Sequence, residues 1–382
     1  MDRNKIFEQG VVGGIKVKNK MIRSATFEYA AIDGKPSAKI YERYEALAKG
    51  EVGLIITGFV SFSKTDQLAD PIVLMQKDSI PSLQRVVDKV HGYGTKIVAQ
   101  LNHAGSQASV TSQETIYAPS AVKDPATGIV PTPLSTEQVK ELVKEFAAAA
   151  VIAKEAGFDG VQMHGAHGYL LNKFLSPMYN NRTDEYGGDF SGRSRIVMEI
   201  AQEIKRKAGK DYPVWIKLNN SDYHRENLGV TEEEFLALSE ELSRIGVDAI
   251  EVSGGTITGT YGPSRSKQHT AYHLEAAKRL AEKVEASVIL VGGIRDVEMA
   301  NSILLDTKIA AISLCRALIC EPDLIKKWRD GEKTTADCIS CNRCFNPLGK
   351  CVFKFTKEEK IQYKAMRAEA KEQKKKQLNS AK

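Results

Sequence analysis

Cysteine is absent from most of the 382-residue chain, since all six cysteines lie after position 314. A secretory signal is absent as well, because the N-terminal MDRNKIFEQG is charged, and no apolar run approaches the roughly 18 residues of a membrane span. We therefore expect a cytoplasmic protein with no membrane partner. Disulfides are rare in the cytosol, so the late cysteine cluster indicates metal, cluster or redox chemistry rather than covalent cross-linking.

Net charge is absent from the first 353 residues. The chain carries a formal charge of +6, and residues 354–382 alone contain ten Lys or Arg against four Asp or Glu, which accounts for all of it. From Thr356 onward the pattern predicts an exposed, charged helix that frays into a disordered end. Aromatic residues do not interleave with these charges in the way that RNA-binding segments require, so we expect no nucleic-acid partner.

The glycine motif of dinucleotide-binding folds, G-x-G-x-x-G, does not follow the first β-like run, which argues against a doubly wound sheet. Instead, eight β-like runs alternate with segments whose apolar residues recur at three- and four-residue spacing. The runs are Met21–Thr26, Val52–Phe59, Lys96–Leu101, Gly160–Met163, Val214–Leu218, Ala249–Val252, Val288–Val291 and Ala310–Leu314. Eight such units over roughly 320 residues predict an α/β fold, a (β/α)8 TIM barrel with extra length in its functional loops.

Three consecutive parts are expected: a barrel over 1–330, a short Cys-rich segment over 331–355, and a basic, helical or disordered tail over 356–382. The segment DCISCNRCFNPLGKC has C-x2-C-x2-C-x6-C spacing. Thiols at this spacing can close a tetrahedral zinc site or hold a [4Fe–4S] cluster, and a reduced vestige of such a site is the third interpretation. The candidate metal ligands are Cys338, Cys341, Cys344 and Cys351.

Polar residues gather just after the predicted strands, at the barrel end where catalytic groups of this fold stand. They are Thr26, Glu28, Gln100, Asn102, His103, His164, His167, Tyr169, Lys217, Asn219, Ser253, Gly254, Gly255, Gly292, Gly293 and Arg316. Backbone N–H groups at the turn VGGIRD and the guanidinium in SLCRAL can together bind an anion. The last two loops therefore predict a phosphate-bearing ligand.

The central stretch HGAHGYLLNKFLSPMYNNRTDEYGGDFSGR, from His164 to Arg193, concentrates the chemistry of the chain. Together with VKNKMIRSAT, GLIITG, KIVAQLNHAG, IKLN, EVSGG, VGGI and CRAL, it resembles the old yellow enzyme family of flavin-dependent ene-reductases. The resemblance covers about residues 5–330 and is greatest to the branch of 2,4-dienoyl-CoA reductase and trimethylamine dehydrogenase. It implies FMN at the barrel mouth, NADH or NADPH as reductant, and ping-pong hydride transfer to an α,β-unsaturated carbonyl or similar activated alkene.

The resemblance also implies a flavin-binding role for several residues. Thr26 would bond the flavin carbonyl near N5, and Gln100 the pyrimidine edge. Lys217 lies in a strand otherwise suited to burial, so it needs a negative partner. That partner would be the N1 edge of the reduced flavin, and the alternative is a salt bridge to a barrel carboxylate. The phosphate would be bound by Gly292, Gly293 and Arg316.

For the substrate, the resemblance implies that His164 and His167 bind and polarise its oxygen and that Tyr169 protonates the α-carbon. A metal site at the two histidines is the alternative, although two ligands do not close a zinc site. Arg193 is expected to support the loop rather than touch flavin. Further candidates to line the pocket are Glu28, Tyr29, Tyr261 and His269.

Two features depart from the family pattern. Cys315 stands where the family usually has Gly before the phosphate-binding arginine, and the third cysteine gap is narrower than in the long family members. Other functions therefore stay open: an iron–sulfur flavoprotein dehydrogenase or demethylase that passes electrons to a partner, a metal-dependent barrel hydrolase or lyase, and a binding protein that acts through its tail. The expected partners are a small-molecule substrate and a nicotinamide nucleotide, and a homo-oligomer stays open.

Overall fold

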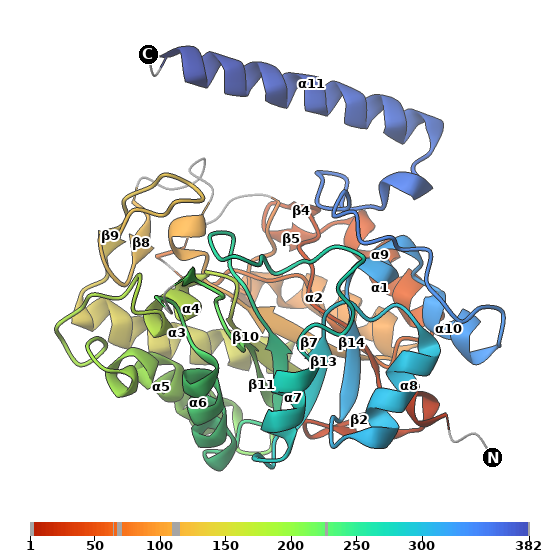
Figure 1. Ribbon diagram of the computed structural model, residues 1–382, viewed down its shortest axis with the longest axis horizontal. Coiled ribbons are helices and arrows are strands. Elements are labelled where there is room, and N and C mark those ends of the chain that lie inside the picture. Colours follow the sequence, from red (N-terminus) through yellow and green to blue (C-terminus); the bar gives the residue numbers. More distant parts are fainter. Residues whose placement is uncertain (1–3, 64, 67–70, 109–114, 226–227, 381–382) are drawn as a thin grey trace.

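The computed structural model describes residues 4–63, 65–66, 71–108, 115–225 and 228–380. Eight parallel strands form a closed barrel (Figure 1). In chain order they are β3 (Met21–Arg23), β6 (Leu54–Ile56), β7 (Lys96–Leu101), β10 (Gly160–Gly165), β11 (Val214–Asn219), β12 (Ala249–Ser253), β13 (Ser287–Val291) and β14 (Ala311–Leu314). The last strand pairs with the first, Ile312 beside Met21, which closes the ring. The predicted TIM barrel and its eight strands are confirmed.

The first two strands are shorter than the sequence predicts. The ladder of β3 ends at Arg23 and that of β6 at Ile56, whereas the apolar runs continue to Thr26 and Phe59. Beyond these ladders the chain keeps single backbone hydrogen bonds to its neighbours, Ser24 to Leu314 and Thr57 to Val98, and Thr26 and Phe59 line a cavity at the barrel mouth. An apolar run in the sequence indicates buried residues, and here the buried residues continue beyond the end of each strand.

Helices cover the outside of the barrel. They are α1 (Ala38–Lys49), α2 (Ile80–His91), α3 (Thr136–Glu155), α5 (Phe190–Ala208), α6 (Glu232–Arg244), α7 (Leu274–Ala281), α8 (Val297–Asp306) and α10 (Leu324–Arg329). Capping boxes fix the start of α3, through Ser135 and Gln138, and of α6, through Thr231 and Glu234. The short helices α4 (Leu170–Leu175) and α9 (Arg316–Cys320) lie instead in the loops that follow β10 and β14.

The hairpin of β1 (Gly10–Val12) and β2 (Ile15–Val17) closes the bottom of the barrel. Trp215, fully buried in the barrel interior, donates its indole N–H to the carbonyl of Gly13 at 2.9 Å. A Cβ on Gly13 would lie 2.4 Å from that indole nitrogen, so only glycine fits at this turn, whose φ is +50°. Apolar packing seals this end and leaves the opposite end free for ligands.

Loops and the C-terminal region occupy the other end (Figure 1). The loops carry the two-residue strands β4 (Ala31–Ile32), β5 (Lys35–Pro36), β8 (Tyr117–Ala118) and β9 (Thr132–Pro133), and the 3-10 helices η2 (Lys77–Ser79) and η3 (Gly105–Gln107). The N-terminal η1 (Lys5–Phe7) packs against α8, and η5 (Val352–Lys354) ends the Cys-rich segment.

The tail forms α11 (Lys357–Ser380), which lies apart from the barrel, above the loops at its upper end in Figure 1. The predicted tail helix is confirmed, and it continues to Ser380. Residues 381–382, the end of the segment predicted to fray, lie outside the described residues. No helix within the described part of the chain has both the length and the apolar character that a membrane span demands.

Candidate active site

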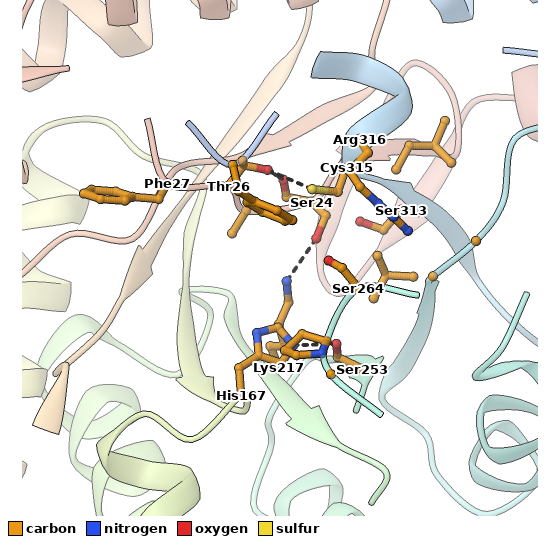
Figure 2. Close-up of a pocket in the computed structure, with 18 of the residues that line it drawn as sticks. Ser24, Thr26, Phe27, His167, Lys217, Ser253, Ser264, Ser313, Cys315 and Arg316 are labelled. Carbon is orange, nitrogen blue, oxygen red and sulfur yellow. Dashed lines mark hydrogen bonds between the residues drawn. The ribbon is translucent and has the colours of Figure 1, made fainter. Parts of the chain in front are cut away.

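A cavity of about 530 Å³ opens at the C-terminal end of the barrel strands. Its volume falls within the range of roughly 300–1,000 Å³ that is usual for cofactor and ligand sites. The nine non-cysteine residues that the sequence assigns to a site all line it: Thr26, Gln100, His164, His167, Tyr169, Lys217, Gly292, Gly293 and Arg316. Figure 2 shows Thr26, Arg316, Lys217 and His167 around this space. Residues that are distant in the sequence thus share one cavity.

Three of the four additional candidates for lining the pocket do not reach it, and Tyr29 alone does. Glu28 accepts ion pairs from Arg23 at 3.1 Å and Arg43 at 3.2 Å, which hold its carboxylate away from the cavity. The rings of Tyr261 and His269 contact each other, with centroids 6.0 Å apart, and Tyr261 is 42% exposed. Partners outside the cavity, which the sequence pattern cannot reveal, decide these orientations.

The end of β10 and the turn after it hold two imidazoles and a phenol together, those of His164, His167 and Tyr169. The ring centroid of His164 lies 5.1 Å from that of His167 and 4.8 Å from that of Tyr169. His167 has φ +64°, a left-handed conformation that costs a non-glycine residue about 1–3 kcal/mol and commonly marks functional sites. Its backbone N–H donates to Asn219 Oδ1 at 3.3 Å, and its Nε2 lies 2.7 Å from Ser253 Oγ.

Burial sets the protonation of this trio. Burial, followed by the charges of His167 and Lys217, holds the pKa of His164 well below 6.5. Burial, followed by Lys217 and His273, does the same to the pKa of His167. Burial raises the pKa of Tyr169 to about 12. At neutral pH the site therefore presents two uncharged imidazoles and a protonated phenol, all hydrogen-bond donors without net charge.

Lys217 has a negative partner within the chain. Its ammonium lies 3.1 Å from Glu251 Oε2 and donates to Ser24 Oγ at 2.9 Å. This is the salt bridge to a barrel carboxylate that the sequence left as the alternative, and the ammonium still lines the cavity. Sequence reasoning missed Glu251, although a carboxylate inside the apolar strand AIEVS is a signal that could have found it.

The residues expected from the sequence to bind a phosphate, Gly292, Gly293 and Arg316, line the same cavity. Gly292 and Gly293 have φ values of +119° and +74°, and a Cβ there would lie 2.6 Å from the Tyr272 ring and 2.7 Å from the His269 carbonyl. Arg316 is 8% exposed, and its Nη1 donates to Arg265 O at 2.8 Å and Asn342 Oδ1 at 2.6 Å. These bonds hold the guanidinium at the cavity wall beside the glycine turn.

Cys315 also lines the cavity. Its Sγ lies 3.1 Å from Thr26 Oγ1 (Figure 2), so the side chain that replaces the family's usual glycine points toward a predicted flavin contact. The Thr26 hydroxyl also lies 3.3 Å from the Ser24 carbonyl. The turn therefore accommodates cysteine without displacing Arg316 from the cavity.

One wall of the cavity is aromatic. The rings of Phe27 and Phe59 stack with centroids 4.9 Å apart and an interplanar angle of 17°, and Phe59 lies 5.6 Å from Tyr169. Ile257 and Phe345, 64% and 51% exposed, border the same space. The wall offers a flat apolar surface next to the polar trio, a combination suited to a planar ligand with one polar group.

Cys338, Cys341, Cys344 and Cys351 share a small hollow with Arg316, and Cys338 also borders the main cavity. Burial raises the pKa of the Cys338 thiol and raises that of Cys344 to about 12. Among the described residues, no three His, Cys, Asp or Glu side chains are arranged to hold a metal ion. The metal site at these cysteines therefore stays a prediction.

Three comparisons place the chain among known proteins. The family model described as NADH:flavin oxidoreductase / NADH oxidase matches residues 5–335. An NADH oxidase of Thermoanaerobacter brockii is 33% identical over 88% of this chain and 52% of its own length, so the chain spans about half of that relative. An NADPH dehydrogenase of Bacillus velezensis is 32% identical over 83% of this chain and 92% of its own length. The structure of an old yellow enzyme homologue from Zymomonas mobilis matches with a TM-score of 0.74 at 25% identity, over 88% of this chain and 95% of that one.

Proposed function

The chain belongs to the NADH:flavin oxidoreductase / NADH oxidase family, and we propose that it is an FMN-dependent enzyme that uses NADH or NADPH to reduce the C=C bond of α,β-unsaturated carbonyl compounds or similar activated alkenes. One observation carries the proposal. Donors suited to a flavin ring, an anion-binding turn and the trio of two histidines and a tyrosine all line the same cavity. A site of this composition suits a flavin and its substrate together.

The residues present fit FMN. Thr26, Gln100 and Lys217 offer hydrogen-bonding groups at one part of the cavity, and the Gly292–Gly293 turn with Arg316 offers an anion site at another. Bound there, the cofactor would supply reversible two-electron chemistry between nicotinamide and alkene. Thr26 and Gln100 would orient its ring, Lys217 would balance negative charge on it, and Arg316 would hold its phosphate.

His164 and His167 supply the polarising groups. As neutral imidazoles they donate hydrogen bonds to the carbonyl oxygen of the substrate without placing a full charge beside it. Negative charge grows on that oxygen as a hydride adds to the β-carbon, so donors fixed in place favour the transition state over the ground state. The strained backbone at His167 and its bond to Ser253 keep one of these donors fixed.

Tyr169 completes the addition. Its hydroxyl forms no hydrogen bond with any described residue, its pKa of about 12 keeps it protonated, and it lines the cavity. The phenol can therefore give its proton to the α-carbon, so that hydride and proton add across the double bond. The phenolate then recovers a proton from solvent.

A single cavity explains a ping-pong order. The aromatic wall of Phe27 and Phe59 suits a nicotinamide ring and a planar enone equally, and both must approach the same face of the cofactor. The nicotinamide product would therefore leave before the alkene binds. This order separates two half-reactions that can be measured independently.

Replacing Tyr169 by phenylalanine tests the proposal. In anaerobic stopped flow, Tyr169→Phe should leave reduction of the bound flavin by NADPH nearly unchanged and slow reoxidation by cyclohexenone by about 10²-fold or more, because only the second step needs the proton. Tyr261→Phe, at a tyrosine outside the cavity, serves as the matched control and should change neither step. Equal slowing of both half-reactions by Tyr169→Phe would remove the proton-donor role.

A second candidate function is an iron–sulfur flavoprotein that dehydrogenates or demethylates a small substrate and passes electrons to a partner. The observation in its favour is the hollow shared by four cysteines, one of which borders the main cavity. It requires about four iron atoms per chain in protein purified anaerobically. Iron at background level, with or without zinc, would eliminate this candidate and leave the first one standing.

A further inference from the structure

A fully buried carboxylate, that of Glu251, lies behind the cavity floor, which Lys217 and Gln100 line. Glu251 lies on β12, beside Lys217 of β11 in the strand register, and has no exposed surface. Its Oε1 accepts from Ser24 Oγ and Ser313 Oγ, each at 2.8 Å, and its Oε2 accepts from Gln162 Nε2 at 2.9 Å. With the Lys217 ammonium 3.1 Å from Oε2, four donors surround one carboxylate. A carboxylate has about four acceptor sites, so all of them are used.

These donors require the carboxylate to be ionised. Burial alone would raise the pKa of Glu251, but the charge of Lys217 and the hydrogen bonds from Ser24, Gln162 and Ser313 outweigh it and hold the pKa below its ordinary value. The hydrogen-bond geometry also indicates an ionised carboxylate. The Ser24 hydroxyl accepts a hydrogen bond from Lys217 and donates its own hydrogen to Glu251. An ionised carboxylate only accepts hydrogen bonds, and this fixes the direction of every bond that it makes.

The ionised carboxylate therefore also fixes the orientation of two side-chain amides, those of Gln162 and Gln100, between Glu251 and the cavity. Gln162 must turn its NH2 group toward Glu251, so its Oε1 faces the other way and accepts from Gln100 Nε2 at 2.8 Å. Gln100 therefore turns its own Oε1 away from Gln162, and this oxygen accepts no hydrogen bond from the described residues. Gln100 lines the cavity, so the buried network presents a carbonyl acceptor to a ligand there.

The same carboxylate sets the charge of the floor. Lys217 and Glu251 form a neutral pair whose side chains are 4% and 0% exposed. Solvent screens such buried charges less than surface charges, so the loss of either one should change the electrostatic energy of a ligand in the cavity. Lys217 lines the cavity and Glu251 does not, which makes Glu251 a group that acts through its neighbours.

We propose that Glu251 is the positioning residue of this floor and acts in two ways. It orients Gln100 through Gln162, so that the Gln100 carbonyl oxygen meets the ring N–H of the cofactor. It also balances the positive charge of Lys217, which lowers the reduction potential of the bound cofactor. The inference rests on the proposed function, because it needs a flavin in the cavity. Reduced flavin carries more negative charge than oxidised flavin, and a floor with an unbalanced ammonium would bind the reduced form more tightly.

The test compares FMN affinity of the apoprotein and the reduction potential of bound FMN in four proteins. Glu251→Gln should weaken binding of oxidised FMN several-fold and raise the potential, by about 30 mV if the preference for reduced over oxidised flavin grows roughly tenfold. Glu251→Asp keeps the charge and should stay near the wild-type potential. Glu321→Gln, which removes another buried, lysine-paired glutamate outside the cavity, is the matched control and should shift nothing.

Each result decides between the claims. Equal potentials in Glu251→Gln and Glu321→Gln would overturn the inference while leaving the proposed function intact. A wild-type protein that binds no FMN would remove the proposed function, and the inference with it. Should Glu251→Gln not fold, Gln162→Met carries the test, since it cuts the amide chain and keeps both charges. A several-fold loss of FMN affinity supports the inference, and an unchanged affinity contradicts it.

Discussion

At the scale of the residue, burial decides which groups of the cavity carry charge. His273 is 2% exposed, borders the cavity, and finds no hydrogen-bond partner for either ring nitrogen among the described residues. Burial, and then the charge of Arg265, lowers its pKa to about 3. With His164 and His167, three imidazoles around one cavity thus resist protonation. Neutral donors suit the polarisation of a carbonyl, and they also make the fold sensitive to acid.

The sign of this acid sensitivity follows from linkage. A histidine whose pKa falls on folding is neutral in the folded protein at a pH where the unfolded chain already binds a proton. The unfolded state then holds more protons, so the free energy of unfolding drops as the pH falls below about 6.5, by up to about 1.4 kcal/mol per pH unit for each such histidine. For His273 the loss would continue down to a pH of about 3.

His273→Gln should therefore flatten this dependence. We expect the free energy of unfolding, measured in urea at several pH values between about 6.5 and 5, to fall less steeply with pH in the variant than in the wild type. The difference in slope should be the contribution of one histidine, up to about 1.4 kcal/mol per pH unit. Identical slopes in the two proteins would show that His273 is not neutral in the folded state.

At the scale of the element, the long loop between α4 and α5 is held by Arg193. Arg193 is 7% exposed, and its guanidinium donates to the carbonyls of Leu175 at 2.8 Å and Gly188 at 2.9 Å and forms an ion pair with Glu234. As expected from the sequence, Arg193 supports the loop, and it does not line the cavity. The second half of the central stretch is thus structural, whereas its first half carries the histidines and the tyrosine.

Removing this arginine should destabilise the protein strongly. Arg193→Met leaves a partly buried glutamate and two carbonyls without their donor, so the free energy of unfolding should fall by about 3–5 kcal/mol in urea titrations. The neighbouring Arg195 is exposed and donates to the carbonyl of Glu185 at 2.9 Å. Arg195→Met is the control and should stay within about 0.5 kcal/mol of the wild type. A loss as small for Arg193→Met as for the control would contradict the supporting role.

The strands show what the sequence could predict and what it could not. Val214–Leu218 and Ala249–Val252 stand out as apolar runs, and both are strands within one residue of the predicted bounds. The pairing of Lys217 with Glu251 depends on the register between these strands, which no local pattern encodes. The sequence therefore indicated that Lys217 needs a negative partner but could not choose between a cofactor and a carboxylate.

At the scale of the whole molecule, short sequence strings spread along the chain were enough to predict nine residues that the fold places in one cavity. The old yellow enzyme family inferred from those strings is confirmed by the family model and the related structure. The expectation that Glu28, Tyr261 and His269 line the cavity was wrong, because ion pairs and ring contacts outside the cavity set their orientation. The position of a residue along its strand decides whether it reaches the mouth of the barrel. The residues that it contacts in the folded protein decide whether its side chain points into the cavity.

The tail stands apart from this body. Contacts of α11 with the preceding segment include an ion pair of Glu359 with Lys350 at 2.8 Å and a ring contact of Tyr363 with Phe355, with centroids 5.4 Å apart. A chain truncated after Thr356 should therefore keep the thermal midpoint and the FMN affinity of the full chain, as followed by circular dichroism and flavin fluorescence. A lower midpoint in the truncated chain would show that α11 packs on the barrel in solution.

The most direct test of the central claim is the visible absorption spectrum of the protein purified anaerobically, with iron and zinc assayed on the same sample. We expect the two visible bands of an oxidised flavin, bleaching when NADH or NADPH is added and returning when an enone follows. A colourless protein that cannot be reconstituted with FMN would contradict the account.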